Sequence, residues 1–130
     1  HQCETASWLA AQLSGDQRLV QVEHPSLSSH PHHSLAKELF DDGLFGAVIN
    51  LTPVGDRQSG MDFCDRLELI TIATSLGGSH SLAGHSASTT HRQYDDAALL
   101  AAGIAPASVR ISVGLEDRRD LLGDILQALG

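Results

Sequence analysis

Residues 107–117 constrain the fold more than any other part of the sequence. Apolar and polar side chains alternate there with the two-residue period of a strand that buries one face. The apolar members are Val109, Ile111 and Val113, and the polar members are Arg110 and Ser112. Gly114 breaks this pattern, and Asp117 is placed to cap a helix whose apolar positions recur at helical spacing as far as Leu129. We therefore expect a half-buried strand that leads directly into an amphipathic helix.

The rest of the chain also alternates between helical and strand patterns. Helices are predicted over residues 1–13, 34–40, 59–67 and 94–102, and strands over residues 19–23, 47–51 and 69–73. Ser34 is the expected N-cap of the second helix. Residues 75–91 are rich in Gly, Ser, Thr and His without periodicity, which is typical of a long functional loop. Several connections are too short for parallel crossovers, so we predict an α+β fold: a small, mainly antiparallel sheet with helices packed on one face.

Charge and cysteine content narrow the class of protein. The 130 residues carry a formal net charge of -8, and the basic residues are scattered, which disfavours nucleic acid and anionic membranes as partners. Cys3 and Cys64 form no metal or redox spacing, so we expect two reduced thiols in a cytoplasmic protein. No signal segment opens the chain, and no apolar run approaches the ~20 residues that a membrane-spanning helix needs.

Arg110 has two interpretations from the residues alone. Its side chain points away from the face that carries Val109 and Ile111. On an edge strand it would lie in solvent, as most arginines do. In a covered cleft, an unpaired guanidinium would be costly, so it should meet an anion there, and its planar fork suits a carboxylate.

Eight histidines raise the question of a metal site. Six of them fall in two polar loop segments: His30, His32, His33, His80, His85 and His91. The H-E-x-x-H motif and a nearby carboxylate are both missing, so we expect no metal ligand, and a zinc protein remains the third hypothesis. The glycines that follow Ser75 form neither a G-x-S-x-G elbow nor a G-x-G-x-x-G phosphate loop.

Two segments resemble a known family. They are ATSLGGSHSLAGHSASTTH, residues 73–91, and AAGIAPASVRISVGLEDRRDLLGDILQAL, residues 101–129. Both are similar to the C-terminal end of the Cys/Met-metabolism enzymes that depend on pyridoxal phosphate. That family includes cystathionine gamma-synthase and gamma-lyase, methionine gamma-lyase and O-acetylhomoserine sulfhydrylase. The resemblance implies the C-terminal domain of a fold-type I pyridoxal phosphate enzyme.

The resemblance implies roles for three residues. Arg110 stands at the arginine that holds the α-carboxylate of the amino-acid substrate. Ser75 stands at the serine of the same end of the site, and Thr90, followed by His91, stands at the threonine that helps to hold this region. No catalytic, cofactor-binding or metal-binding residue is expected in the chain itself.

The cofactor is expected outside this chain. An enzyme of this kind needs a lysine for the cofactor, and the one lysine, Lys37, falls in a predicted surface helix. The resemblance implies that residues 1–14 end an interdomain helix, that residues 15–130 form a substrate-clamping domain, and that a large domain absent from the chain binds pyridoxal phosphate. His80 and Ser86 depart from the acidic residue and the proline common in the family, which bears on substrate choice.

The expected function is therefore part of a transsulfuration-type enzyme. The chain would supply the substrate-carboxylate clamp of a carbon-sulfur lyase or sulfhydrylase that acts on a sulfur amino acid or an activated homoserine. The expected partners are the large domain, the amino-acid substrate and further copies in a homo-oligomer, and the chain alone would be inactive. The alternative is a detached, non-catalytic binding or scaffolding domain derived from the family.

Overall fold

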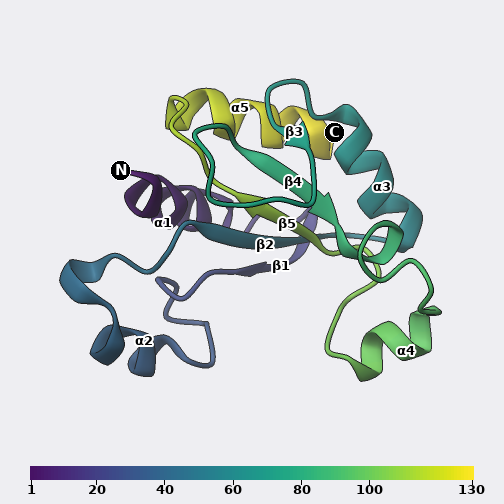
Figure 1. The fold of residues 1–130 in the computed structure, drawn as a ribbon, viewed down its shortest axis with the longest axis horizontal. Helices are drawn as coiled ribbons and strands as arrows, with labels where there is room; N and C mark the ends of the chain where they lie inside the picture. Colours follow the sequence, from purple (N-terminus) through teal and green to yellow (C-terminus); the bar gives the residue numbers. More distant parts are fainter.

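The computed structural model describes residues 1–130 and contains one five-stranded sheet with the strand order β1-β2-β5-β4-β3 (Figure 1). The strands are β1 (Leu19–Glu23), β2 (Val48–Pro53), β3 (Thr71–Ile72), β4 (Leu82–His85) and β5 (Val109–Ser112). Three of the four strand pairs are antiparallel, and only the pair of β3 and β4 is parallel. The prediction of a mainly antiparallel sheet is confirmed.

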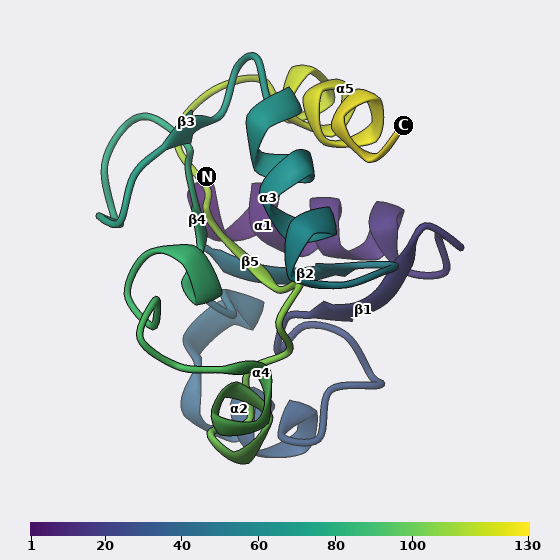
Figure 2. The ribbon, with the colours of Figure 1, turned by 90° about the vertical axis from the view of Figure 1, so that its right-hand side faces the viewer.

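The three longer helices lie together on one face of the sheet, whereas the two short helices lie on the opposite side (Figure 2). The longer helices are α1 (Gln2–Leu13), α3 (Arg57–Arg66) and α5 (Arg118–Leu129). The short ones are α2 (His33–Leu39) and α4 (Asp96–Ala101), and single 3-10 turns occupy η1 (Asp41–Gly43) and η2 (Ser86–Ser88). None of these helices combines the length and apolar character that crossing a bilayer requires. The α+β prediction is confirmed, with α2 and α4 outside the helical layer.

The core lies between the sheet and the three longer helices. Ile111 on β5 and Ile49 on β2 are register partners and almost completely buried. From the helices, Leu9, Phe63 and Ile125 fill the same cluster. The alternation in residues 109–113 therefore has the predicted cause, because its apolar members all belong to this core.

Side-chain caps mark the starts of α3, α4 and α5, but not those of α1 and α2. Asp117 caps α5 as predicted, because its carboxylate accepts the backbone N–H of Arg119 at 2.7 Å. α3 begins two residues earlier than expected, since Asp56 and Ser59 form a reciprocal capping box. The expected cap of α2 is wrong: His32 occupies the N-cap position and makes no side-chain cap bond.

The predicted loop over residues 75–91 contains a central strand instead. β4 pairs with β5 on one side and with β3 on the other, and Ala83 is completely buried. Ala and Gly have low strand propensity, and this strand carries Ala83 and Gly84 at its centre. Pairing along both edges, rather than local preference, holds it extended. The neighbouring strand, predicted over 69–73, shortens to Thr71–Ile72.

Candidate functional site

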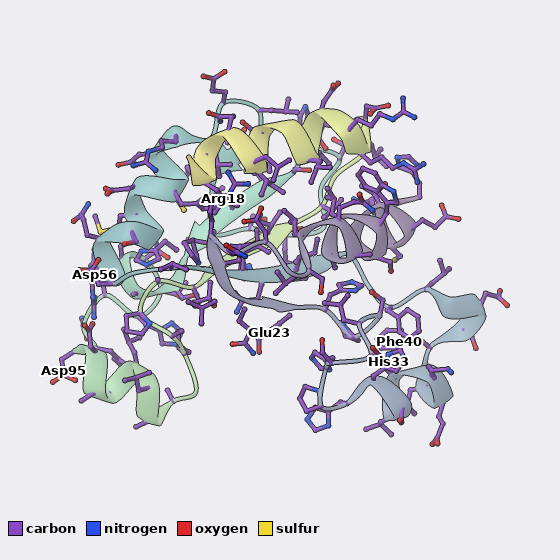
Figure 3. The ribbon with its side chains drawn as sticks, turned by 180° about the vertical axis from the view of Figure 1, so that it is seen from behind. Arg18, Glu23, His33, Phe40, Asp56 and Asp95 are labelled. Carbon is purple, nitrogen blue, oxygen red and sulfur yellow. The ribbon has the colours of Figure 1, made fainter.

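Four residues form a row across the sheet on the face opposite the core. Glu23 pairs with Asn50, Asn50 with Arg110, and Arg110 with Gly84, one residue from each of four adjacent strands. Their side chains share a face because register partners in a sheet point the same way. Figure 3 shows Glu23 on the side of the sheet away from α5. The Asn50 amide donates to the Glu23 carboxylate at 2.6 Å, so that carboxylate already has a partner.

Arg110 lies at the middle of this row, on a central strand. Of the two interpretations of Arg110, the one that places it on an edge strand is wrong, because β5 is paired with β2 and β4. Its Nη2 donates to the backbone carbonyls of Thr74 at 2.8 Å and Ser75 at 3.3 Å. Its Nε is buried and has no hydrogen-bond partner. Because a buried charged donor without a partner is costly, this atom marks a place where an anion would bind.

A small hollow opens beside the guanidinium. It has a volume of about 20 Å³, and its lining contains a glycine, hydroxyl side chains and a single charged group. The lining residues are Thr74, Gly84, Ser86, Thr89, Thr90 and Arg110. With no carboxylate in that lining, the hollow suits a small negatively charged oxygen group.

The residues predicted for the site come together in part. Thr90 lines the hollow with Arg110, is exposed, and places its Oγ1 2.9 Å from His91 Nδ1. Ser75 reaches the guanidinium through its backbone carbonyl, while no hydrogen bond of its hydroxyl joins it to Arg110. Its position in the segment therefore matters more than its side chain. His80 is exposed beside Ser79 and does not line the hollow.

Three of the lining residues were not singled out from the sequence: Thr74, Gly84 and Thr89. Thr74 precedes Ser75 in the same motif, so its backbone carbonyl was the easiest to anticipate. Gly84 lies against the guanidinium, but an added Cβ would make only ordinary van der Waals contacts, 3.4 Å from the Ala73 carbonyl and 3.9 Å from Arg110 Nη2. Thr89 donates its hydroxyl to the His85 carbonyl at 2.8 Å, which fixes the wall at the end of β4.

Arg57 holds that same wall from the side of α3. Its Nη1 donates to the Ala87 carbonyl at 2.9 Å, and its Nη2 donates to the Tyr94 carbonyl and to the Asp96 carboxylate, each at 2.8 Å. A cation in the first turn of a helix is disfavoured by the helix dipole. These contacts offset that cost and connect residues 87–96 to α3.

The histidines do not form a metal centre. No group of three or more His, Cys, Asp or Glu side chains comes together in the structure. His85 is buried, and its Nε2 donates to the Pro106 carbonyl at 2.7 Å, so its Nδ1 accepts from the Ser88 hydroxyl at 2.8 Å. Burial lowers the pKa of this imidazole, which remains neutral and acts as a structural support.

The residues around Arg110 do not fit pyridoxal phosphate. The lining contains no lysine amine, no aromatic ring to stack on a pyridine, and no acidic partner for its nitrogen. Lys37 is exposed on α2, and no residue of α2 lines the hollow. Larger hollows, up to about 430 Å³, lie elsewhere, such as along β1, but they hold no unpaired buried cation. The Arg110 hollow is chemically suited to a small anionic group.

Comparisons with known proteins find several enzymes that are similar to this chain. The O-acetyl-L-homoserine sulfhydrylase of Leptospira meyeri is 38% identical over 112 residues, which cover 86% of this chain and 25% of that protein. The structure of cystathionine gamma-lyase from yeast matches with a TM-score of 0.92 and 36% identity, covering 98% of this chain and 33% of that one. Cystathionine gamma-synthase from Xanthomonas oryzae, solved in complex with cystathionine, matches with a TM-score of 0.87 and 38% identity over 98% of this chain and 33% of that one.

The match extends over the whole chain but over only part of each relative. The chain spans about a quarter to a third of the length of these proteins. A family model described as Cys/Met metabolism PLP-dependent enzyme matches residues 1–130. The chain therefore belongs to the pyridoxal-phosphate-dependent enzymes of cysteine and methionine metabolism.

Proposed function

We propose that this chain supplies the substrate-carboxylate clamp of a transsulfuration-type enzyme, a carbon-sulfur lyase or sulfhydrylase. The substrate is a sulfur amino acid or an activated homoserine. The observation that carries the proposal is the buried Nε of Arg110, which lacks a partner beside a hollow that contains no acidic group. A substrate carboxylate would accept from this fork in a bidentate arrangement.

The clamp acts by orientation. The Thr74 and Ser75 carbonyls hold one nitrogen of the guanidinium, so the fork presents its remaining donors in a fixed direction. Thr90 bounds the other side of the hollow. When bound, pyridoxal phosphate supplies the electron sink for the bond cleavage, and Arg110 fixes the substrate relative to it. The cofactor is held by a part of the enzyme outside these 130 residues.

The proposed partner is the cofactor domain of the same enzyme, in a homo-oligomer. The segment from α2 to β2 carries large apolar side chains that are 39–70% exposed: Leu35, Leu39, Phe40, Leu44 and Val48. Apolar surface of this kind indicates a covering partner. Residues 1–14 would then belong to the interdomain helix and residues 15–130 to the clamping domain. Because Cys3 and Cys64 are free thiols, we place the enzyme in the reducing cytoplasm.

A detached binding or scaffolding domain is the second candidate. It is favoured by one observation, the absence of lysine from the lining of the hollow. Under this alternative, Arg110 would still bind a carboxylate, but no turnover would depend on it. Catalysis by the full-length protein therefore separates the two candidates.

The decisive experiment replaces Arg110 in the pyridoxal-phosphate-loaded, full-length enzyme. Arg110→Ala should lower kcat/KM for the amino acid about 100-fold, as expected for one lost partner of a desolvated charge pair. Arg110→Lys should recover part of this loss, because it restores the charge without the fork. Arg119→Ala is the matched control, since Arg119 is exposed on α5 and its side chain makes no ion pair. An unchanged kcat/KM in Arg110→Ala would refute the clamp.

A substrate analogue sharpens the same experiment. The decarboxylated amine lacks the group that Arg110 would hold, so wild-type enzyme should process it poorly. Arg110→Ala should lower kcat/KM for this amine far less than for the amino acid. The amine has no carboxylate, so the contact that the mutation removes is already absent when wild-type enzyme binds it. Equal losses for the two compounds would point to a general structural role for Arg110.

A further inference from the structure

Glu116 follows β5 and holds the far end of the segment that contacts Arg110. Its Oε1 accepts the backbone N–H of Ser81 at 2.6 Å, and its Oε2 accepts the Ser81 hydroxyl at 2.8 Å. Ser81 is completely buried, and its hydroxyl in turn accepts the backbone N–H of Gly114 at 2.8 Å. Glu116, Ser81 and Gly114 thus close a ring of hydrogen bonds between residue 81 and the end of β5.

The ring is packed too closely for any other residue at position 114. A Cβ added to Gly114 would overlap Glu116 Oε2, the Ser79 carbonyl and the Ser81 amide nitrogen. The backbone N–H of Leu115 also donates to the Ser79 carbonyl at 2.8 Å. Glycine therefore serves here by allowing close backbone approach rather than by an unusual φ.

Three residues in or just after β5 each bond to a different part of residues 74–81. Arg110 donates to the carbonyls of Thr74 and Ser75, at the start of the segment. Ser112 accepts the backbone N–H of Gly77 at 3.0 Å, in the middle. Gly114, two residues further along, meets the ring at Ser81. Arg110 and Ser112 face the same side because side chains alternate along a strand, and Gly114 follows two residues after the end of β5.

We propose that Glu116 is a positioning residue for Arg110. By fixing Ser81, Glu116 sets the path of residues 74–81, and so the place of the carbonyls that orient the guanidinium toward the substrate carboxylate. This inference rests on the proposed function of Arg110. Glu116 touches neither substrate nor cofactor in this scheme and acts through Ser81.

The electrostatics of Glu116 agree with this role. The carboxylate pairs with no lysine or arginine, so its ionised form serves as a hydrogen-bond acceptor. Burial alone would raise its pKa, but the hydrogen bonds from Ser81 and from its own backbone, with the nearby His80, leave the pKa below the usual value. The group therefore remains charged at neutral pH.

The test measures KM and kcat of the full-length holoenzyme carrying Glu116→Gln, Glu116→Ala or Ser81→Ala. Glu116→Ala should raise KM for the amino acid about tenfold with a smaller change in kcat, because carboxylate binding is what loosens. Glu116→Gln keeps one acceptor oxygen and should raise KM less. Ser81→Ala removes the hydroxyl that bonds Glu116 Oε2 and Gly114 but keeps the backbone N–H bond to Oε1, so it should raise KM in the same direction by a smaller factor if Glu116 variants fold poorly.

Asp124→Asn is the matched control. Asp124 is also a carboxylate that accepts backbone N–H groups, from Glu68, Leu69 and Ile70, but it lies on α5 in the helical layer. This variant should lower the melting temperature at least as much as Glu116→Gln while leaving KM unchanged. An equal rise of KM in Asp124→Asn would show that general destabilisation, not positioning, raises KM.

A double-mutant cycle separates this inference from the proposed function. Glu116→Ala should add no further rise of KM in an Arg110→Ala background, because the group that it positions is gone. A full additional rise there would overturn the positioning role of Glu116, as would an unchanged KM in both Glu116→Ala and Ser81→Ala. If Arg110→Ala itself leaves KM unchanged, the clamp fails instead.

Discussion

The two faces of the sheet differ in how complete they are. On the helical face, α1, α3 and α5 bury a continuous apolar cluster against the sheet. On the opposite face, a buried arginine nitrogen lacks a partner, and large apolar side chains between α2 and β2 are exposed. The first face accounts for folding. The second face carries the two features on which the proposed substrate site and the proposed covering domain rest.

The largest effect is expected from damage to the complete face. Ile111→Ala removes a side chain that is 1% exposed and packed beside Ile49 and Ala83, so it should cost about 2–5 kcal/mol of unfolding free energy. Urea denaturation of the full-length enzyme measures this loss. A loss below about 1 kcal/mol would mean that this face is not the stabilising core.

A smaller effect is expected from the one buried carboxylate of the chain. Asp124 is buried on α5, and Asp124→Ala should cost about 1–3 kcal/mol because three backbone N–H groups lose their acceptor. Burial opposes ionisation, but these bonds and the one from Gln127 lower the pKa of Asp124 below its usual value.

The pH dependence checks the same contact. A carboxyl whose pKa is lower in the folded than in the unfolded state contributes stability above the unfolded value, about 4, and loses it as pH falls through the folded value. The melting temperatures of wild type and Asp124→Ala should therefore converge below about pH 4. A difference that stays constant from pH 7 to acid would contradict a charge-dependent contact.

The smallest effect tests the incomplete face. Val48 is 39% exposed and shares a register row with Ser112. If the cofactor domain covers this face, Val48→Thr should cost about 1 kcal/mol in the full-length enzyme, because a covered methyl group is replaced by a hydroxyl. A cost near zero in urea denaturation would place this face in solvent and remove one support for the proposed partner.

The helical face was predictable from the sequence, whereas the opposite face was so only in part. Alternation around Ile111 and the cap at Asp117 are local patterns, and they gave the last strand and helix correctly. β4 escaped prediction because its extended form depends on pairing with β3 and β5, which are distant in sequence. Asp124 escaped as well, since a polar residue among the apolar positions of a helix gives no hint of the N–H groups it will meet.

The hollow beside Arg110 shows the same division. Arg110 and Thr90 were found through the family resemblance, and the structure brings them to one lining. The contact between the Ser75 backbone carbonyl and the Arg110 guanidinium was not predictable, because residue identity says nothing about the direction of a backbone carbonyl. Glu116 had no signal beyond its acidic character, and its role depends on a contact with Ser81, 35 positions earlier in the chain.

The position of Arg110 on β5 bears on how such enzymes vary their substrates. β5 has hydrogen-bonded neighbours on both sides, so the backbone at Arg110 is held from two directions. An α-carboxylate is common to all amino acids, whereas side chains and leaving groups differ among them. Under the proposed clamp, a fixed strand would hold the shared group while the surrounding loops diverge, so new specificities could arise without changing the anchor.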